Sequence, residues 1–526
     1  MARIGIGLLC ALALIALGCS EDAAVGGSGG MGGGTGAVGG GTGAVGGGTG
    51  ATAGGTGATG GGTGATAGGT AATGGGDGDG SVSGSLPGEW ASRSGGPLNQ
   101  RARMGGGLNS GNVAGLGEVW NVEAPTMMTG TPAIYGGIAY FTESTGRIDA
   151  VDAATGVQIW TSQQLCSRWL VSSPLVTGDS VYIGCWGRGY ALNRADGTVR
   201  WMSIIDESQP LTNITGSPKL AGNRVIFALA NSQETTPDVT GGHGWIAGLA
   251  VSNGNVDWKL DTAEGGVGVS VWSSAAVDDA RGVFYIGTGQ SWTAPERRYA
   301  DSILAVTFDG QVLWHHKFHE GDIFRAVGAA GGLDFDIGAE PNLWTLGNTE
   351  VVSAGSKGGL FKVLDRQTGQ EIWQKQVGMG GSAGGVHATA AVDDESDVIY
   401  VLNNEWRAYQ FTSGGHSPQD TAELIKLNGA NGDVIWSQQM SAPVLGGGVL
   451  LVNDVVFSVI LNGFIVANNT SNGSELWRAD LGHDAATAPS FAGDMVFVAG
   501  GLVTGGLSPG SGGSRPPGGH VRAFGL

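Results

Sequence analysis

The stretch from Gly265 to Asp322 concentrates side chains that could take part in chemistry. Trp272 stands at the mouth of one predicted strand, the run VFYIGTGQSW ends the next strand in a glycine-bounded loop, and Asp301 precedes the strand after that. An aromatic ring and a carboxylate at the ends of adjoining strands are suited to line one wall of an active site. We therefore begin the prediction of function from this segment.

The histidine-rich run WHHKFHEGD in the same stretch predicts no zinc site. His316 would share a strand face with Trp314, and His315 would lie on the opposite face, so the imidazoles do not converge as zinc requires. No Ser/His/Asp nucleophile pattern stands out, and no Cys-x-x-Cys-His run is present to attach a haem covalently. The chemistry therefore has to come from other groups.

The elements that position these residues are predicted to be strands. From Trp90 onward, β-branched and aromatic runs alternate with turns, and no stretch keeps a helical period. The strongest structural signal is a repeat in which a tryptophan follows the glycine of a tight turn by four residues. The pairs are Gly156/Trp160, Gly197/Trp201, Gly254/Trp258, Gly310/Trp314, Gly369/Trp373, Gly432/Trp436 and Gly473/Trp477. Glycine accepts the positive φ of the hairpin, and the even offset points each indole toward the adjoining blade.

Trp120 departs from the repeat because no hairpin glycine stands four residues before it. Conversely, the last strands reach Leu526 without supplying a tryptophan. We interpret the strand around Trp120 as the one that completes the final blade, which removes the open sheet edges. The sequence thus predicts an all-β, eight-bladed β-propeller whose last blade is closed by an N-terminal strand. The long insertions between Trp201 and Trp436 predict that the functional face is built from those blades.

The Ala-x-Asp-x-x-Thr-Gly-x-x-x-Trp pattern, clearest in AVDAATGVQIW, resembles the repeat of pyrroloquinoline-quinone (PQQ) propellers. The segment around Trp272 and Asp301 resembles the cofactor blade of the PQQ-dependent alcohol dehydrogenases, most closely the polyvinyl-alcohol-dehydrogenase-like branch. The resemblance runs from about Trp90 to the C-terminus and is densest between Val225 and Glu405. It implies oxidation of a small or polymeric alcohol, with PQQ as cofactor and a separate electron acceptor.

The resemblance implies roles for three residues. Trp272 matches the floor on which the quinone stacks. Asp301 matches the catalytic base that takes the alcohol proton, and Lys357 matches the cation at the polar edge of the cofactor. The alternatives are an ordinary core tryptophan, a turn-capping aspartate and a solvated lysine.

A calcium ion polarises the quinone carbonyl in this family. Glu234 loosely matches its acidic ligand, and Asp301 lies at the same site. Gln290 stands where Asn or Asp is usual, and both Glu234 and Gln290 could equally be solvated loop residues. Asp336, in the run LDFDIGAEPNLW, and His387, in GGVHATAAVDD, fall on further stretches that resemble the family's cofactor site. Structural hydrogen bonding at the channel rim is the alternative for both, and the vicinal cysteine pair of some members is absent.

The overall charge and the first residues bear on partners and location. A net charge of -19 repels phosphate backbones and argues against nucleic acid as a partner. Residues 1–18 read as a lipoprotein-type signal peptide, with lipid attachment at Cys19 and ordinary secretion as the alternative. Residues 19–85 form a Gly/Thr/Ala-rich flexible linker and residues 86–526 the propeller. We expect an exported, periplasmic or outer-membrane lipoprotein that touches the membrane through its anchor only.

Two cysteines remain in the mature chain, Cys166 and Cys185. Export to an oxidising compartment permits a disulfide between them, and two buried thiols are the alternative.

A protein-binding scaffold is the rival functional hypothesis. The lipoprotein scaffold of bacterial outer-membrane assembly shares the repeat and the anchor, and Gln290 together with the missing cysteine pair is the best support for this hypothesis. The enzyme hypothesis requires Trp272, Asp301, Lys357 and Glu234 to gather at one end of an axial pore with room for a flat tricyclic guest.

Overall fold

The computed structural model describes residues 89–124, 126–128, 130–166, 172–209, 211–233, 241–325, 333–405, 421–444, 446–501 and 518–526. The predicted signal peptide and linker, together with Cys19 and Glu234, lie outside the described residues. Within them, none of the helical segments has the length and apolar character of a membrane span.

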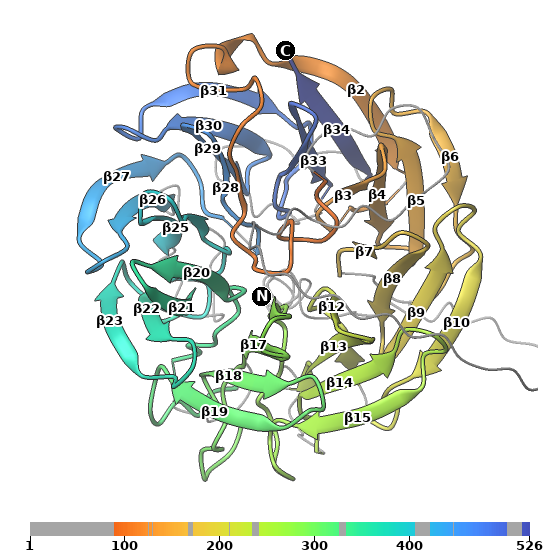
Figure 1. Ribbon diagram of the computed structural model, residues 1–526, viewed down its shortest axis with the longest axis vertical. Coiled ribbons are helices and arrows are strands. Elements are labelled where there is room, and N and C mark those ends of the chain that lie inside the picture. Colours follow the sequence, from red (N-terminus) through yellow and green to blue (C-terminus); the bar gives the residue numbers. More distant parts are fainter. Residues whose placement is uncertain are drawn as a thin grey trace, which may run out of the picture. The chain divides into compact units, whose positions relative to one another are not determined.

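The described strands form eight sheets around one axis, which confirms the predicted eight-bladed all-β propeller (Figure 1). Blade 1 contains β3 (Ala133–Tyr135), β4 (Ile138–Glu143), β5 (Arg147–Asp152) and β6 (Gln158–Thr161). Blade 2 contains β7 (Leu175–Val176), β8 (Ser180–Cys185), β9 (Arg188–Asn193) and β10 (Val199–Ile204). Blade 3 contains β11 (Thr212–Asn213), β12 (Lys219–Ala221), β13 (Arg224–Asn231), β14 (Trp245–Ala250) and β15 (Val256–Asp261). Blade 4 contains β16 (Ala276–Asp278), β17 (Val283–Gly287), β18 (Ser302–Thr307) and β19 (Val312–Lys317).

The remaining blades follow the same order from the inner strand to the outer strand. Blade 5 contains β20 (Asn342–Leu346), β21 (Thr349–Gly355), β22 (Leu360–Asp365) and β23 (Glu371–Gln376). Blade 6 contains β24 (Ala391–Asp393), β25 (Val398–Glu405), β26 (Thr421–Asn428) and β27 (Val434–Met440). Blade 7 contains β28 (Leu450–Val452), β29 (Val455–Ile460), β30 (Phe464–Asn469) and β31 (Glu475–Asp480), with β1 (Ala102–Arg103) paired to β28. Blade 8 contains β32 (Ser490–Ala492), β33 (Met495–Gly500) and β34 (Gly519–Gly525).

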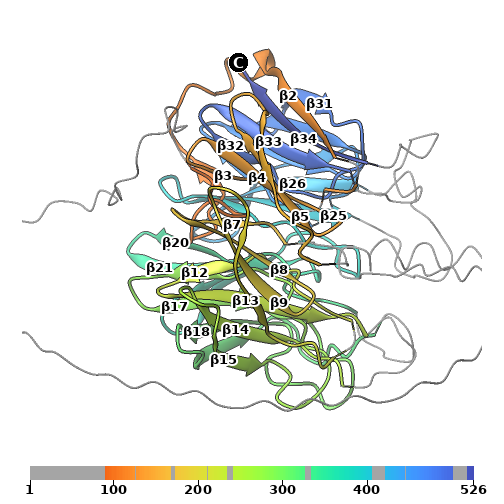
Figure 2. The ribbon, with the colours of Figure 1, turned by 90° about the vertical axis from the view of Figure 1, so that its right-hand side faces the viewer.

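The eighth blade closes as the sequence predicted. Strand β2 (Gly117–Ala124) pairs antiparallel with β34 and becomes its outer strand, so that Trp120 lies opposite Ala523. A short 3₁₀ helix, η1 (Val113–Gly115), precedes β2. Figures 1 and 2 show blade 1 beside blade 8, where the two ends of the propeller sequence meet.

The tryptophans of the repeat hold neighbouring blades together. Each indole N–H on an outer strand donates a hydrogen bond to a backbone carbonyl of the next blade. Trp477 of blade 7 completes this circle of contacts by donating to the carbonyl of Leu116, which precedes the outer strand of blade 8. The donor and acceptor pairs are Trp120 to Ala153, Trp160 to Arg194, Trp201 to Val251, Trp258 to Phe308, Trp314 to Arg366, Trp373 to Gly429 and Trp436 to Thr470. The hairpin glycines also pack against these rings: a Cβ on Gly197 would lie 2.5 Å from Trp160. The glycine is therefore needed for its positive φ and for its missing side chain.

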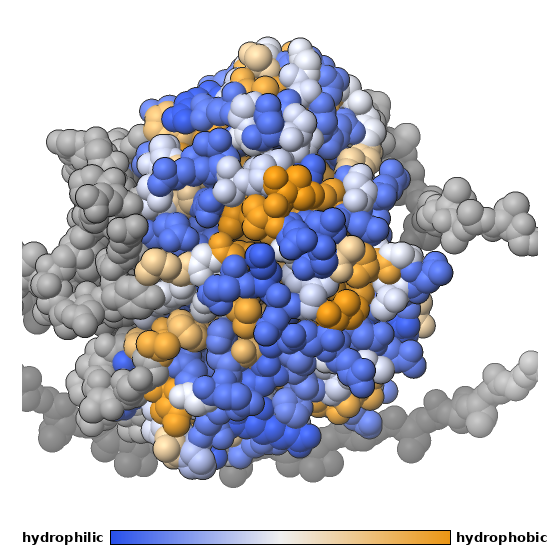
Figure 3. Space-filling model, turned by 90° about the vertical axis from the view of Figure 1, so that its left-hand side faces the viewer, coloured by the Kyte–Doolittle hydropathy of each residue, from blue (hydrophilic) through white to orange (hydrophobic). Residues whose placement is uncertain are grey.

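The outer strands carry exposed aliphatic side chains beside these tryptophans. Ile372 is on β23, and Val434 and Ile435 are on β27. Figure 3 shows apolar surface interspersed with a mainly hydrophilic exterior on this side of the molecule.

Strand alternation gives the propeller two different faces. The tight turns that join first to second strands and third to fourth strands form one face, here called the turn face. The connections between second and third strands, and those between successive blades, form the opposite loop face. The loop-face connections relevant to function are 262–275, 288–301, 318–341, 356–359 and 377–390, of which 326–332 are outside the described residues.

The axis of the ring is occupied by the segment Glu89–Arg103, here called the strap (Figure 1). The strap makes backbone hydrogen bonds to the inner strands of successive blades, and Lys219 of blade 3 donates to three strap oxygens. The backbone pairs are Trp90 with Ile134, Ala91 with Val176, Pro97 with Val277, Leu98 with Leu343, Gln100 with Val392 and Arg101 with Leu451. The strap therefore fills the axial pore at the level of the inner strands, so the expectation of a pore open along the whole axis was wrong, and a flat guest would have to lie on the loop-face side of the strap.

Candidate active site

Three of the predicted residues meet on the loop face of blades 4 and 5. The Trp272 indole N–H donates to Asp336 Oδ2 over 3.0 Å, and Lys357 Nζ lies 2.9 Å from the same oxygen. Lys357 Nζ also lies 5.2 Å from the centroid of the Trp272 ring, within the range of a cation–π contact. An aromatic plate and a cation separated by 85 positions in the sequence, from 272 to 357, are thus joined through one carboxylate.

Asp336 organises this cluster from the connection between β19 and β20. Its Oδ1 accepts the backbone N–H of Gln290 at 2.8 Å, and its own carbonyl accepts the backbone N–H of Lys357 at 2.9 Å. Lys357 makes a second ion pair with Asp334 at 2.7 Å. Burial raises the pKa of Asp334 to about 6, against the opposing effect of Lys357. The ammonium is thus held by two buried carboxylates.

His387 lies beside the same aromatic ring. Its ring centroid is 6.3 Å from that of Trp272, and its Nε2–H donates to the carbonyl of Gly384 at 2.8 Å. Burial, followed by the nearby Lys357 charge, lowers the pKa of His387 to about 3. The imidazole is therefore neutral at physiological pH, so that it adds a polar ring to the site and no charge.

Asp301 is the most unusual group of the site. It is fully buried, its φ is +49°, and neither carboxylate oxygen has a hydrogen-bond partner among the described residues. Burial, followed by repulsion from Asp336 and Asp322, raises its pKa well above the ordinary value. A buried carboxyl group without partners is costly unless a proton or a cation accompanies it. Asp301 is therefore suited to exchange a proton or to bind a cation.

The residues present fit the cofactor and the metal that the sequence resemblance implied. The orphaned Asp301 oxygens suit a hard cation such as calcium, and Gln290 is buried three residues after the end of β17. Trp272 and Lys357 suit a flat, anionic ring. Among the described residues, no group of three or more His, Cys, Asp and Glu side chains is arranged to hold a metal. Glu234 lies outside them, so the calcium ligand set stays a prediction.

Gly338, which no motif in the sequence singles out, also shapes the site. A Cβ on Gly338 would lie 1.6 Å from the Trp272 ring, so only glycine leaves room for the indole. In a chain with 103 glycines, no local signal distinguishes this one.

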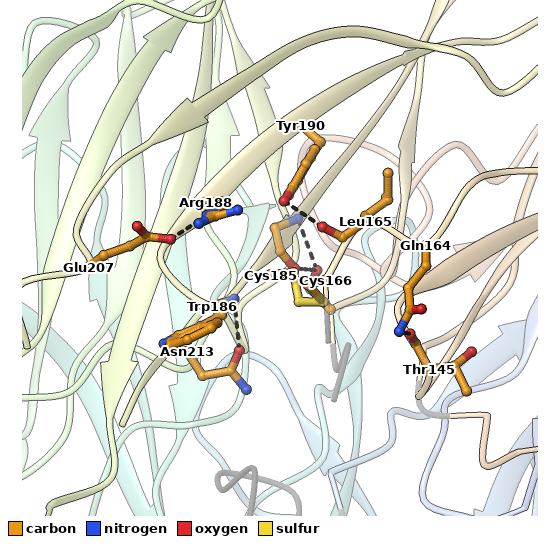
Figure 4. Close-up of a disulfide and its surroundings, with 12 residues drawn as sticks. Thr145, Gln164, Leu165, Cys166, Cys185, Trp186, Arg188, Tyr190, Glu207 and Asn213 are labelled. Carbon is orange, nitrogen blue, oxygen red and sulfur yellow. Dashed lines mark hydrogen bonds and ion pairs between the residues drawn. A yellow bond between two sulfur atoms is a disulfide. The ribbon is translucent and has the colours of Figure 1, made fainter. Parts of the chain in front are cut away.

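Cys166 and Cys185 form a disulfide in the structure (Figure 4). The bond joins the connection between blades 1 and 2 to the end of β8 on the loop face. Tyr190 Oη donates to the carbonyl of Leu165 at 2.7 Å and fixes the same connection.

A cavity of about 270 Å³ lies elsewhere, between blades 6 and 7. Its lining includes Gln438, Met440 and Asn468, and its charged residues Glu475 and Arg478 pair with each other. It contains none of the residues of the candidate site. The chemistry described above therefore points to the loop face of blades 4 and 5, where the charged and aromatic groups converge.

Two family models match the chain. The model described as "Glucose/ethanol/alcohol dehydrogenase, beta-propeller domain" matches residues 194–379, which include the candidate site. The model described as "Outer membrane protein assembly factor BamB" matches residues 111–245 and 420–508, on either side of it. The site blades and the flanking blades thus resemble different propellers.

Comparison with individual proteins favours the dehydrogenases. The polyvinylalcohol dehydrogenase of a Pseudomonas species is 25% identical over 473 residues, which cover 79% of this chain and 73% of that protein. The enzyme of the same name from a Sphingopyxis species is 23% identical, with 79% and 72% covered. The quinohemoprotein alcohol dehydrogenase structure from Comamonas testosteroni superposes with a TM-score of 0.69 at 21% identity, covering 83% of this chain and 80% of that one. The resemblance inferred from the sequence is confirmed: this chain is an eight-bladed PQQ-type propeller related to the PQQ-dependent alcohol dehydrogenases.

Proposed function

We propose that this chain is an exported PQQ-dependent dehydrogenase that oxidises an alcohol and passes the electrons to a separate acceptor. The observation that carries the proposal is the convergence of Trp272, Lys357 and Asp336 beside Asp301, whose carboxylate oxygens are orphaned. The relatives named above, two of them called polyvinylalcohol dehydrogenases, support the same reaction class and extend the candidate substrates to polymeric alcohols.

Each residue has a distinct task in this proposal. Trp272 provides the surface on which the cofactor stacks, and Lys357 places a positive charge where a reduced, anionic ring would be stabilised. PQQ, when bound, would supply an electrophilic carbonyl that accepts a hydride, and with it two electrons, from the alcohol carbon. Asp301 takes the hydroxyl proton of the alcohol.

Asp301 can act as a base only when it is ionised. Because burial and the neighbouring carboxylates favour its protonated form, a positive charge has to be held beside it. Asp301 and Gln290, together with Glu234, would hold a calcium ion there. The calcium site thus explains how a fully buried aspartate loses its proton near neutral pH.

The proposed location follows from the start of the chain. A signal peptide over residues 1–18 and a lipid on Cys19 would anchor the protein, and the linker to residue 85 would hold the propeller clear of the membrane. The described part begins on the turn face, where the Glu89 carboxylate accepts the backbone N–H of Gly136 at 3.3 Å. The loop face, and with it the candidate site, would then be directed away from the point where the linker joins.

The test is alcohol-dependent dye reduction by the purified protein supplied with PQQ and calcium. We expect activity that requires both additions, and a change in PQQ absorbance on binding. Absence of both binding and turnover would refute the proposal.

A scaffold function is the second candidate, because the BamB family model matches residues 111–245 and 420–508. A protein that binds no PQQ but captures envelope proteins through its flanking blades would establish this function instead.

A further inference from the structure

The hairpin that joins β8 to β9 holds a tryptophan in a backbone conformation that tryptophan disfavours. Cys185 pairs with Arg188, which leaves Trp186 and Gly187 as a two-residue loop. Their φ angles are +42° and +68°. Two-residue hairpin loops with positive φ at both positions prefer Asn, Asp or Gly at the first one. A bulky side chain there raises the free energy of the folded state.

Contacts on several sides hold the hairpin in this conformation (Figure 4). The disulfide fixes Cys185, the residue before the loop. The backbone N–H of Trp186 donates to Asn213 Oδ1 at 3.3 Å, and the carbonyl of Gly187 accepts the backbone N–H of Ile205 at 2.7 Å. The Trp186 ring is half-buried, and Figure 4 shows it beside the Asn213 side chain. The surroundings therefore present this ring in a fixed position on the loop face.

Backbone strain of this kind is concentrated on the loop face. Among the described residues, the non-glycine residues with positive φ on the turn face are of types that tolerate it, namely Asp397, Asn453 and Asp494. On the loop face the corresponding residues are Trp186, Leu211, Glu264, Val269, Asp301 and Asp334. Asp301 and Asp334 belong to the candidate site, and Val269 precedes Trp272 by three positions. Strain at such residues is typical of functional surfaces.

A short path of contacts connects Trp186 to the candidate site. Strand β11 ends at Asn213 and pairs with β13, whose last residue Asn231 has a carbonyl that accepts the Ser270 hydroxyl at 3.0 Å. Ser270 stands two residues before Trp272. With strands about 4.8 Å apart, Trp186 lies on the order of 15 Å from Trp272. An extended substrate that reacts at Trp272 would reach this distance.

We propose that Trp186 is a specificity-determining residue that contacts the hydrocarbon chain of the alcohol substrate. The proposal rests on the proposed function, which supplies the alcohol. A rigid, half-buried indole offers a flat apolar surface whose conformational entropy has already been lost, so that contact with methylene groups costs little ordering. The strain in its backbone is then retained because an aromatic ring is needed at this place.

Replacement of Trp186 by a residue that suits the turn distinguishes a role in substrate binding, measured by KM, from a role in stability, measured by Tm. In Trp186→Asn, we expect KM for 1-dodecanol, whose extended chain is long enough to reach from Trp272 to Trp186, to rise on the order of tenfold and KM for ethanol to change less than about twofold, since ethanol has almost no chain to contact. Asparagine tolerates positive φ, so Tm should equal or exceed that of the unmodified protein. Trp186→Phe should preserve KM, and Met202→Ala, an exposed residue on the outer strand of the same blade, should change neither quantity.

Two results would overturn the proposal. One is an unchanged KM for 1-dodecanol in Trp186→Asn; the other is a lower Tm with equal changes of KM for both alcohols, which is the signature of a purely structural residue. If the unmodified protein oxidises no alcohol, the proposed function has failed independently. Isothermal titration of 1-dodecanol then decides the role of Trp186: weaker binding by Trp186→Asn supports the contact, and equal binding refutes it.

Discussion

The two faces of this propeller are built by different physical means. On the turn face and the outer rim, the same arrangement of hairpin glycine and tryptophan recurs from blade to blade, and each indole hydrogen bonds to the next blade. On the loop face the connections differ in length and bury the charges of Asp301, Asp334, Asp336 and Lys357. The comparison indicates that repeated local contacts stabilise the ring, while the irregular connections carry the chemistry. The four predictions below test this division.

Removal of the buried acid should give the largest effect. Asp301→Asn keeps the shape of the side chain but can no longer accept a proton, so we expect kcat to fall by about 10² to 10⁴. Folding should not suffer, because the amide has no charge to bury. Dye reduction and thermal unfolding measure the two quantities, and retained activity would contradict the role of Asp301 as a base.

Removal of the buried Lys357 ammonium should lower the free energy of unfolding far more than removal of an exposed cation. Lys357→Met leaves Asp334 and Asp336 without their counter-charge, and we expect a loss of about 3 kcal/mol in the free energy of unfolding. The control is Arg200→Met. Arg200 pairs with Asp179 on the surface and should contribute less than about 1 kcal/mol. Urea unfolding compares the two variants, and equal losses would contradict the difference between the faces.

On the turn face, replacing a hairpin glycine by alanine should lower the free energy of unfolding for two separable reasons, backbone strain and a clash with the neighbouring tryptophan. Gly310→Ala forces alanine into φ +83° and brings its Cβ to 2.6 Å from the Trp258 ring, so we expect a loss of about 2–3 kcal/mol. Gly282→Ala is the matched control, because its φ is +66° and nothing lies within 4 Å of its Cβ. This variant should lose about 1 kcal/mol from backbone strain alone. Dehydrogenase activity below the unfolding temperature should be unchanged in both variants.

The smallest expected effect is a dependence of stability on pH. The pKa of His387 is about 3 in the folded protein, below the ordinary value of 6.5, so on acidification the unfolded chain takes up a proton that the folded protein does not. Stability from this residue is present above pH 6.5 and is lost as pH falls toward 3. His387→Asn should therefore lose less stability than the unmodified protein between pH 6.5 and 4, by on the order of 2 kcal/mol. The free energy of unfolding of both proteins is measured between pH 6.5 and 4. If the two curves run parallel, the imidazole of His387 is not held neutral in the folded protein.

Much of the architecture could be predicted from residues close together in the chain. The glycine and tryptophan pairs predicted the blades, and the missing glycine before Trp120 predicted the strand that closes blade 8, now seen as β2 against β34. Trp272, Lys357, Asp336 and His387 could be nominated, and the fold places them together. Their roles stay proposals, as does that of Asp301.

Other features depended on contacts that no local pattern reports. The strap residue Arg101 donates to the carbonyls of Val449 and Pro489, more than 340 positions away, so the plugged axis could not be anticipated. Gly338 matters only because the Trp272 ring fills the space that a side chain would need. The sequence by itself determined the number of blades and their closure, because hairpin chemistry and strand alternation act within about a dozen residues. Only the tertiary structure decided that Asp301 is buried with no hydrogen-bond partner in the described part of the chain, that Asp336 links an indole to an ammonium, and that Trp186 is held in a strained turn. The reason is that burial and electrostatic coupling depend on segments brought together by folding.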